Sequence, residues 1–316
     1  MRVVVTDQAF GNVAHERAAA QAIEAAFGEH QCRSEEETIA AVRGANVVFN
    51  NFAPMNERTM GVMAKGATVI RYGVGVDNVD LEAARRLGIH VCNVPDYGVE
   101  EVADHAAAMA LSLSRKLGRY DAGIRDGEWK IGAMVDQVRS LSQSMVGLVG
   151  FGRIARAFAR RMQVFGAKVV AYDPYVSAAD ADAAQATMAP FEGVIEQADI
   201  LSLHVPLTPE TRHMIGRAEI ARMRKGAILI NVSRGGLVDE TALAEALANG
   251  HLGGAGLDVF EKEPLPAEVP LRAAPNTIFS PHAAFFSDAS VERLQRLAAE
   301  EGLRALKGEP LRCALT

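Results

Sequence analysis

Cysteine is scarce in this sequence, and the few cysteines that occur lie far apart. Cys32, Cys92 and Cys313 form an odd set whose spacing fits neither a disulfide framework nor a zinc site. Such usage is typical of reduced thiols in a cytoplasm. Long hydrophobic runs are also missing: no stretch of about 18 apolar residues occurs, and the N-terminal segment "MRVVVTDQAF" lacks the apolar core of a signal peptide. We therefore expect a cytoplasmic protein that does not enter a membrane.

Charge of one sign is not concentrated anywhere along the chain. The 33 basic and 39 acidic residues give a net charge of −6 and form no long block. The sequence therefore predicts no basic surface for nucleic acid and none for an anionic membrane. What the chain does contain is 316 residues with 49% apolar and 23% charged side chains, which is typical of a globular protein with two domains of ordinary size.

Short runs of β-branched residues alternate with helix-like segments along most of the chain. The first set has expected strands at residues 3–6, 46–50, 67–72 and 90–94, with expected helices at 13–26, 35–42, 56–63 and 81–87. A long helix should start near Val99, and the second set has expected strands at 145–149, 168–172, 200–203, 227–231, 254–258 and 277–279. A final helix over 287–307 should be capped by Ser287. This rhythm predicts an α/β protein built from parallel sheets flanked by helices.

A glycine-rich segment, "MVGLVGFGRIARAFARRM", joins a strand-like run to a helix-like run. Gly150, Gly152 and Ala155 have the G-x-G-x-x-A spacing of a dinucleotide-binding turn. The first glycine permits a tight turn, the second lets the backbone approach a pyrophosphate, and the small third residue packs the helix on the strand. The amide groups of Arg153 and Ile154 would then face the phosphates. The alternative is an ordinary strand-to-helix turn.

Asp173 lies 21 residues after Gly152, at the end of "KVVAYDP". A carboxylate at this place can accept hydrogen bonds from both ribose hydroxyls of an adenosine, and it would repel a 2′-phosphate. The spacing therefore favours NAD over NADP. Considered without the glycines, Asp173 could be a turn cap before Pro174.

Three polar side chains follow expected strands in the second half of the chain: Arg234, Glu263 and His282. The carboxyl ends of parallel strands share one edge of a sheet, where ligands bind in open α/β folds. There an arginine can bind a carboxylate through two parallel hydrogen bonds, a histidine can transfer a proton near neutral pH, and a glutamate can stabilise the imidazolium. Each residue alone has an ordinary structural explanation. The hypothesis therefore depends on their joint placement beside a dinucleotide.

Glu101 and His105 are one helical turn apart in "EEVADH", a spacing that could ligate a metal ion. No third ligand of suitable spacing accompanies them in the sequence. Acidic residues at the start of a helix are explained by the helix dipole, which favours negative charge at that end. We therefore expect no metal site.

Longer segments resemble the D-isomer-specific 2-hydroxyacid dehydrogenase family. They are "GLVGFGRIARAFARRMQVFGAKVVAYDP", "LHVPLTPETRHMIG", "INVSRGGLVDETALAEAL", "GAGLDVFEKEP" and "SPHAAFFSDAS". The upstream segment "RYGVGVDNVDLEAARRLGIHVCNVPDYGVEEVADHAAAMAL" resembles the same family, so the resemblance covers nearly the whole chain. The segments "SPHAAFFSDAS" and "VPDYGVEEVADH" are most similar to the branch named after C-terminal binding protein.

This resemblance implies two Rossmann-like domains with parallel sheets. A flavodoxin-like substrate domain would contain residues 1–97 plus 285–316, and an NAD-binding Rossmann domain would contain residues 98–284. The resemblance also implies NAD as the cofactor and a homodimer formed through the NAD-binding domains. In that dimer the long helix from about Val99 and the loop around Trp129 would embrace the partner.

The resemblance also implies roles for single residues. Arg234, Glu263 and His282 match the family's catalytic triad. Asp258 matches the residue that binds the nicotinamide carboxamide. The backbone amides of Val74 and Gly75 match the group that holds the substrate carboxylate opposite Arg234. The implied cofactor-binding set is Gly150, Gly152, Arg153, Ile154, Asp173, Val205, Pro206, Thr211, Val232, Ser233, Asp258, His282 and Ala284; the implied substrate-binding set is Val74, Gly75, Asn51 and Arg234, with Asn50, Phe52, Phe285 and Phe286 shaping the side-chain pocket.

We therefore predict an NAD-dependent oxidoreductase that transfers a hydride between nicotinamide and a small D-2-hydroxy acid or 2-oxo acid. His282 would be the acid and base, Glu263 its partner, and Arg234 the ligand of the substrate carboxylate. The alternative is an NAD(H)-sensing, protein-binding module of the co-repressor type. The intact triad favours the enzyme, because a scaffold has no physical need for ionisable groups at the nicotinamide. Glyoxylate, hydroxypyruvate, a sugar acid and a branched 2-oxo acid all remain open as substrates.

Overall fold

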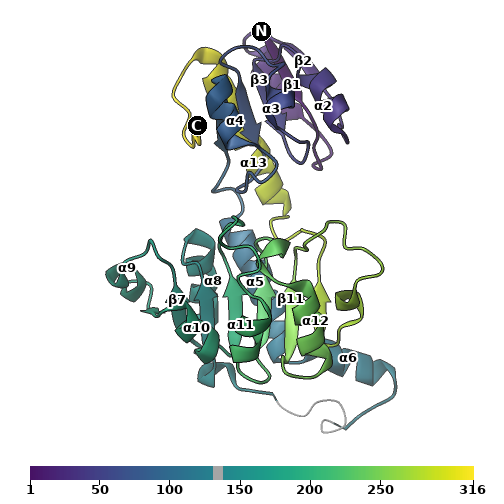
Figure 1. Cartoon of the computed structure of the whole chain (residues 1–316), viewed down its shortest axis with the longest axis vertical. Coiled ribbons are helices and arrows are strands. Elements are labelled where there is room, and N and C mark those ends of the chain that lie inside the picture. Colours follow the sequence, from purple (N-terminus) through teal and green to yellow (C-terminus); the bar gives the residue numbers. More distant parts are fainter. Residues whose placement is uncertain (131–137) are drawn as a thin grey trace. The chain divides into compact units, whose positions relative to one another are not determined.

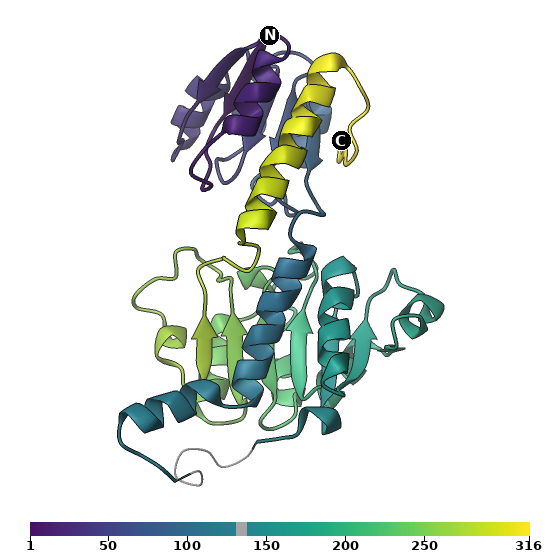
Figure 2. The same cartoon turned by 180° about the vertical axis from the view of Figure 1, so that it is seen from behind.

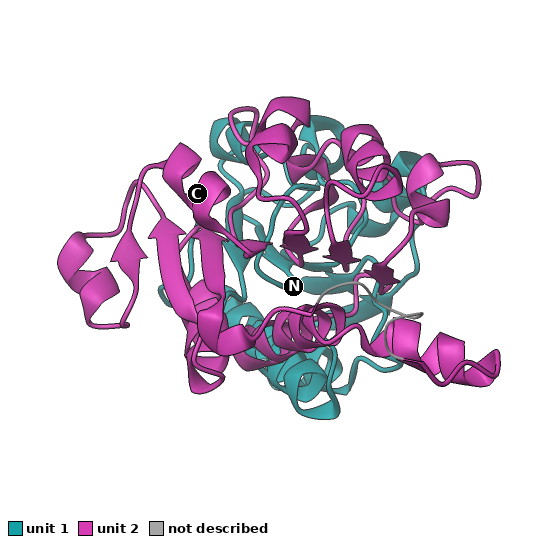
Figure 3. Ribbon diagram, turned by 90° about the horizontal axis from the view of Figure 1, so that it is seen from below, with its two compact units in different colours: residues 1–98, 286–316 teal, residues 99–285 magenta. Residues whose placement is uncertain are grey.

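The computed structural model describes residues 1–130 and 138–316 and divides into two compact units. Unit 1 contains residues 1–98 and 286–316, and unit 2 contains residues 99–285. The chain therefore crosses from one unit to the other twice, and Figure 3 colours the two units separately. Each unit has its own parallel sheet with helices on both faces. The predicted α/β class with two parallel-sheet domains is confirmed.

Unit 1 is built on the strands β1 (Arg2–Val5), β2 (Ala26–Glu29), β3 (Val47–Asn50), β4 (Thr68–Arg71) and β5 (His90–Asn93), with the helices α1 (Ala14–Gln21), α2 (Glu35–Val42), α3 (Glu57–Met60), α4 (Leu81–Leu87) and α13 (Asp288–Lys307). All neighbouring strands are parallel, in the flavodoxin-like order β2-β1-β3-β4-β5. Helices α1 and α13 cover one face of the sheet, and α2, α3 and α4 cover the other (Figure 1 and Figure 2).

The predicted helix over 13–26 is wrong in its second half. Helix α1 ends at Gln21, and Glu24 takes a positive φ of 54°, which breaks the helix. The chain then forms β2 at the edge of the sheet, where its residues are only partly buried. The alanine-rich composition before β2 favours a helix, and a half-exposed edge strand lacks the apolar run by which the central strands were predicted.

Unit 2 contains the strands β6 (Met145–Val149), β7 (Lys168–Tyr172), β8 (Thr187–Met188), β9 (Ile200–Leu203), β10 (Ile228–Asn231), β11 (Gly254–Leu257) and β12 (Thr277–Phe279). Its α-helices are α5 (Val99–Ser114), α6 (Leu117–Arg125), α8 (Arg153–Val164), α9 (Ala178–Asp182), α10 (Phe191–Gln197), α11 (Arg217–Arg222) and α12 (Glu240–Ala248), and its short 3-10 helices are η1 (Leu141–Gln143), η2 (Gly235–Leu237) and η3 (Pro270–Ala273). The six predicted strands match to within one residue, whereas the two-residue strand β8 was not predicted.

The sheet of unit 2 has the order β12-β11-β10-β9-β6-β7-β8, and all its strand pairs are parallel. Helices α5 and α8 lie on one face and α10, α11 and α12 on the other, as the two opposite views show (Figure 1 and Figure 2). The connections run in opposite directions on the two sides of β6, so the strand order reverses there. In an open α/β sheet, a ligand binds outside the carboxyl ends of the strands at such a reversal.

The last helix confirms its predicted cap. Helix α13 begins at Asp288, and the Ser287 hydroxyl accepts a hydrogen bond from the Ser290 amide at 3.0 Å. That contact satisfies one of the amide groups that the first turn leaves without an intrahelical partner. Among the described residues, none of the helices has both the length and the apolar character needed to cross a bilayer.

Candidate active site

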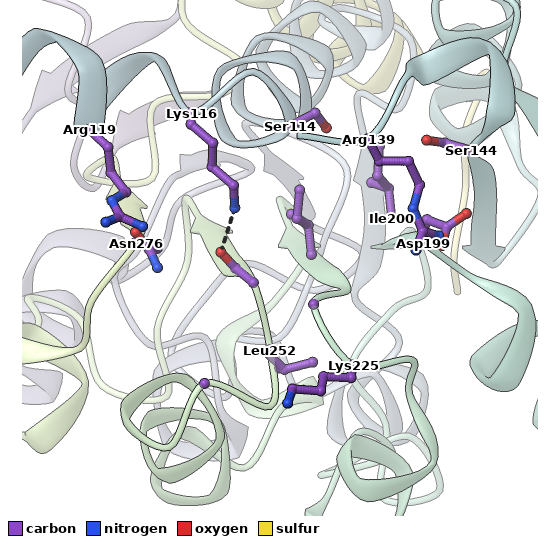
Figure 4. A pocket seen from close by; sticks show the side chains of 14 residues that line it. Ser114, Lys116, Arg119, Arg139, Ser144, Asp199, Ile200, Lys225, Leu252 and Asn276 are labelled. Carbon is purple, nitrogen blue, oxygen red and sulfur yellow. Dashed lines mark hydrogen bonds and ion pairs between the residues drawn. The ribbon is translucent and has the colours of Figure 1, made fainter. Parts of the chain in front are cut away.

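One large pocket in unit 2 lies at the edge opposite the carboxyl ends of the strands. It has a volume of about 620 Å³, and its lining includes residues that directly precede strands, namely Ser144, Asp199 and Gly253 (Figure 4). Lys116 Nζ donates a hydrogen bond to the Gly253 carbonyl oxygen at 3.1 Å, and Figure 4 marks this bond by the dashed line from Lys116. Because ligands of open α/β sheets bind at the carboxyl edge, the candidate active site is expected at that edge and not in this pocket.

The glycine turn after β6 is built for close approach of a ligand. Gly150 has a positive φ of 89°, and a Cβ atom placed on it would lie 2.5 Å from the His204 carbonyl oxygen, so only glycine fits. Gly152 caps α8, and no described atom lies within 4 Å of the place where its Cβ would be. Ala155 is fully buried, which lets α8 pack on β6. The amides of the first turn of α8 have no intrahelical partners, so this helix N-terminus can accept a pyrophosphate.

Asp173 follows β7 and its carboxylate is held beside the glycine turn. Its Oδ2 atom accepts a hydrogen bond from the Phe151 amide at 2.8 Å, and its Oδ1 atom accepts one from the Tyr175 amide at 2.9 Å. Each carboxylate oxygen has a further lone pair for a ligand hydroxyl. Asp173, the residue predicted to bind the ribose, therefore lies at the same edge of the sheet as the glycine turn predicted to bind the phosphates.

The loop after β9 is folded on itself at this edge. The Thr211 hydroxyl donates to the Pro206 carbonyl oxygen at 2.7 Å, and it accepts from the Thr208 amide at 2.8 Å. Val205 lies directly after His204, and the side chain of Val205 would be 2.9 Å from a Cβ at Gly150. The predicted cofactor residue Val205 therefore lies beside the glycine turn, and Pro206 and Thr211 lie in the same loop after β9.

Asn231, the last residue of β10, sets the turn that carries Arg234. Its side-chain amide donates to the Arg234 carbonyl oxygen at 2.8 Å, and its oxygen accepts from the Ser233 amide at 3.1 Å. The Ser233 hydroxyl also donates to the Leu203 carbonyl oxygen at 2.8 Å, which ties this turn to the end of β9. Asn231 is almost completely buried, and sequence reasoning did not identify it.

Gly235 brings the Arg234 turn against the loop that carries Glu263. A Cβ atom on Gly235 would lie 1.8 Å from the carbonyl carbon of Phe260, so no side chain can be accommodated. The Phe260 amide in turn donates to Glu263 Oε1 at 3.0 Å. The loops after β10 and β11 are thus in backbone contact, which places the two predicted catalytic residues on adjoining segments.

Glu263 and His282 are hydrogen-bonded to each other. The distance from His282 Nδ1 to Glu263 Oε2 is 2.8 Å, and both side chains are about one-third exposed. A carboxylate can only accept, so the ring nitrogen Nδ1 donates. The Nε2 atom of His282 has no hydrogen-bond partner among the described residues. The ring is therefore oriented by Glu263 and presents its second nitrogen for proton transfer.

Two opposing influences set the pKa of Glu263. Burial raises the pKa, and this is the largest single influence. The hydrogen bond and charge of His282, the Phe260 amide and the charge of Arg234 act in the other direction and hold the pKa of Glu263 below its ordinary value of 4.5. Glu263 is therefore a carboxylate at neutral pH, and Arg234 lies close enough for its charge to contribute.

Glu263→Gln should weaken the loss of stability in acid. Because the pKa of Glu263 is lowered by folding, its carboxylate contributes stability that is fully present above 4.5 and is lost as the pH falls through the lower folded-state pKa. Urea unfolding of the wild type and of E263Q, from neutral pH into acid, measures this difference. Identical pH dependence of the unfolding free energy in the two proteins would contradict it.

Asp258 holds the loop that carries His282. Its carboxylate is 1% exposed, and Oδ1 accepts from the Ala283 amide at 2.8 Å while Oδ2 accepts from the Ala284 amide at 2.9 Å. The Ser280 hydroxyl donates to Oδ1 at 2.5 Å. The family resemblance implied that Asp258 binds the nicotinamide carboxamide, but it gave no sign of this structural role. Val232, another predicted cofactor residue, is largely buried after β10.

The predicted substrate residues of unit 1 lie after two neighbouring strands. Asn51 follows β3, and Val74 and Gly75 follow β4, so all three are at the carboxyl edge of that sheet. Val74 is 46% exposed, and its carbonyl oxygen accepts a hydrogen bond from the Asn93 side-chain amide at 2.6 Å. Of the aromatic residues predicted to shape the pocket, Phe52 and Phe286 are exposed and Phe285 is partly buried, and Asn50 is fully buried.

Asp7 holds a loop of unit 1 through backbone amides, as Asp258 holds the His282 loop of unit 2. Its buried carboxylate accepts hydrogen bonds from the amides of Asn51 at 3.1 Å, Phe52 at 2.6 Å and Ala53 at 3.2 Å. This contact fixes the loop after β3 that contains the predicted substrate residue Asn51. Asp7 was not identified from the sequence, because nothing there distinguishes this acidic residue after the first strand from other acidic residues.

Comparison with known proteins assigns the chain to a family. The family described as D-isomer specific 2-hydroxyacid dehydrogenase, NAD binding domain, matches residues 107–284. The glyoxylate reductase of Korarchaeum cryptofilum (strain OPF8) is 38% identical over 258 residues, which cover 81% of this chain and 78% of the relative. The D-3-phosphoglycerate dehydrogenase of Methanocaldococcus jannaschii is 36% identical over 282 residues, and there the chain spans only 52% of the relative's length.

Solved structures share the complete fold. The TT0316 protein of Thermus thermophilus has a TM-score of 0.87 at 35% identity, with all of both chains covered. The D-lactate dehydrogenase of Aquifex aeolicus, solved with NAD and lactic acid, has a TM-score of 0.87 at 28% identity, covering 98% of this chain and 96% of that one. The resemblance predicted from the sequence is confirmed, and so is NAD as the cofactor. The chain therefore belongs to the D-isomer-specific 2-hydroxyacid dehydrogenase family, as an NAD-dependent dehydrogenase.

Proposed function

We propose that this protein interconverts a small 2-oxo acid and the corresponding D-2-hydroxy acid, with His282 as the proton donor and acceptor. Residues 98–284 would bind NAD, and residues 1–97 with 285–316 would contribute to the substrate site. The protein would act in the cytoplasm. Relatives named glyoxylate reductase make glyoxylate the first substrate to test. Membership of the branch named after C-terminal binding protein, which two sequence segments indicate, stays a prediction.

The observation that carries this proposal is the pair formed by His282 and Glu263. The 2.8 Å hydrogen bond orients the imidazole, and the Glu263 carboxylate stabilises the ring when it is protonated. An imidazole held in one orientation at the carboxyl edge of a dinucleotide-binding sheet is suited to general acid–base catalysis.

Each residue of the site has a separate task in the reaction. When bound, NADH supplies the hydride that reduces the carbonyl carbon of the acid. Protonated His282 gives its Nε2 proton to the carbonyl oxygen, and Glu263 holds the ring and its charge until that transfer. In the oxidative direction, neutral His282 takes the hydroxyl proton through the same atom. The balance is one hydride and one proton added to the carbonyl group in reduction, and both removed in oxidation.

The substrate carboxylate needs positive charge and donors close to the reacting carbon. We assign this task to Arg234, whose planar guanidinium can form two parallel hydrogen bonds to a carboxylate. The backbone amides of Val74 and Gly75, with Asn51, would complete the site. The experiment that tests the proposed function is a screen of 2-oxo acids with NADH and NADPH, followed by the absorbance of the reduced nicotinamide. Reduction of no 2-oxo acid in the screen would overturn it.

Asp173→Ala should relax the preference for NAD over NADP. The carboxylate would repel a 2′-phosphate, and its removal takes away that repulsion together with two ribose hydrogen bonds. We expect KM for NADH to rise and KM for NADPH to fall, as steady-state kinetics with both cofactors will show. Because Asp173 also accepts the Phe151 amide, Asp173→Asn serves as the matched control that keeps an acceptor there. A wild type that already prefers NADPH would contradict this role.

We also propose that the protein is a homodimer formed through the NAD-binding domains. Trp129 is 85% exposed, and Ile124 on α6 is 48% exposed, so large apolar side chains gather near this part of the chain. Residues 131–137, within the predicted embracing loop, lie outside the described residues. Sedimentation equilibrium measures the mass directly, and a monomer at all concentrations would contradict the dimer.

A further inference from the structure

His105 contacts the loop that carries His282. It lies on α5, and its Nε2 atom is 2.8 Å from the Ser280 hydroxyl oxygen. That oxygen is 2.5 Å from Asp258 Oδ1, and His105 Nε2 itself is 3.8 Å from the same carboxylate atom. The imidazole, the hydroxyl group and the buried carboxylate therefore form a continuous chain of polar contacts from the helix to the loop.

The chemistry of the three groups fixes the direction of each hydrogen bond. A carboxylate only accepts, so Ser280 gives its single hydroxyl proton to Asp258. The Ser280 oxygen must then accept from His105, and Nε2 of His105 must carry a hydrogen atom. Among the described residues, no cluster of three or more His, Cys, Asp or Glu side chains could hold a metal ion. His105 therefore acts here as a hydrogen-bond donor to the Ser280 hydroxyl oxygen.

Asp258 links the contact with His105 to the backbone of the loop that carries His282. Its carboxylate accepts the amides of Ala283 and Ala284, and its backbone oxygen accepts the amide of His282 at 2.7 Å, which closes the loop on the end of β11. His282 has a positive φ of 55°, a conformation that a residue other than glycine rarely adopts. Such a conformation persists only where surrounding contacts hold it.

The two chain segments joined by this network are those next to the crossings between the units. Helix α5 begins at Val99, directly after the first crossing, and Ala284 is followed by Phe285, the last residue before the second crossing. Anchoring on both segments keeps the His282 loop in one place within unit 2. We propose that His105 is a positioning residue for His282, acting through the Ser280 hydroxyl and the Asp258 carboxylate. This inference rests on the proposed function of His282.

A pair of substitutions at His105 separates hydrogen bonding from packing. His105→Leu removes the donor, whereas His105→Gln keeps an N–H group at a similar distance from the backbone. We expect H105L to lower kcat about tenfold, because a small misplacement of a catalytic group is costly, and H105Q to restore most of that loss. The affinity for NADH, measured by its fluorescence, should change less than kcat in both variants. The control is His251→Leu, which removes a histidine that contacts the Ile220 carbonyl oxygen elsewhere in unit 2.

A double-mutant cycle tests whether the effect passes through Ser280. Adding H105L to Ser280→Ala should lower kcat little further, because the link is already broken. Three results would overturn the inference: kcat of H105L within twofold of the wild type, equal losses in H105L and H105Q, or full additivity with S280A. If the wild type reduces 2-oxo acids and H282A does not, the proposed function stands whatever His105 does.

Hydrogen exchange gives a readout that does not depend on turnover. In H105L, the peptide that contains the Ala283 and Ala284 amides should exchange about fivefold faster or more, because the carboxylate that accepts them is less firmly held. The same peptide should exchange at the wild-type rate in H105Q and H251L. Unchanged exchange in H105L would overturn the positioning role even if the enzyme's substrate were never found.

Discussion

His282→Ala should lower kcat at least about a hundredfold while leaving the affinity for NADH nearly unchanged. The substitution removes the group that would give a proton to the carbonyl oxygen, and no other histidine is hydrogen-bonded to Glu263 among the described residues. The backbone amide of residue 282 still reaches the Asp258 carbonyl oxygen, so the loop keeps one of its anchors. Steady-state kinetics with a 2-oxo acid and NADH, together with direct binding of NADH, measure the two effects separately.

The control for this substitution is His251→Ala, which changes a histidine of the same unit that lies outside the candidate site. That variant should have the kcat of the wild type. Comparable turnover in H282A and the wild type would show that the proton comes from another group. A large loss of NADH affinity in H282A would instead mean that His282 acts mainly through the cofactor site.

Arg234→Lys should lower kcat/KM for a 2-oxo acid about tenfold to a hundredfold. A lysine keeps the positive charge, but a single ammonium group cannot reproduce two parallel hydrogen bonds to a carboxylate. The turn itself should survive, because the Asn231 side chain holds it through hydrogen bonds to the Arg234 carbonyl oxygen and from the Ser233 amide, neither of which involves the Arg234 side chain. The loss should appear in KM and in kcat, because the carboxylate grip both binds the acid and aligns its carbonyl carbon.

A substrate without a carboxylate makes this test specific. Reduction of a simple aldehyde, which the wild type should catalyse poorly, should be nearly insensitive to R234K. The matched control is Arg222→Lys, because Arg222 forms an exposed ion pair with Glu196 at 2.8 Å and lies away from the candidate site. Equal losses with the acid and the aldehyde would show that Arg234 does not bind the carboxylate.

The regular part of the fold was predictable because buried parallel strands have a clear pattern. Strands such as β9 and β10 are completely buried and read as short apolar runs, so their bounds follow from the sequence. Strand β2 was not predictable in the same way. It is a half-exposed edge strand that follows an alanine-rich helix, and its pairing with β1 depends on residues distant in the sequence.

The ionisable residues of the candidate site could be predicted from the sequence, but the residues that hold their loops in place could not. Arg234, Glu263 and His282 were identified because ionisable groups followed strands whose carboxyl ends share one edge. Asp258 supports the His282 loop by accepting hydrogen bonds from the Ala283 and Ala284 amides, which lie 25 and 26 positions further along the chain. Nothing in a residue's own neighbourhood in the sequence specifies such a partner. Gly235 is similar, because its need for glycine comes from the Phe260 backbone, 25 positions further along the chain.

The most direct test of the proposed mechanism is a crystal structure with NADH and oxamate, an unreactive analogue of a small 2-oxo acid. The mechanism predicts that the oxamate carboxylate binds Arg234 and the amides of Val74 and Gly75. It also predicts that His282 Nε2 donates to the oxamate carbonyl oxygen, with the carbonyl carbon against the reactive face of the nicotinamide. An oxamate bound away from His282, or a His282 ring turned from the nicotinamide, would contradict it.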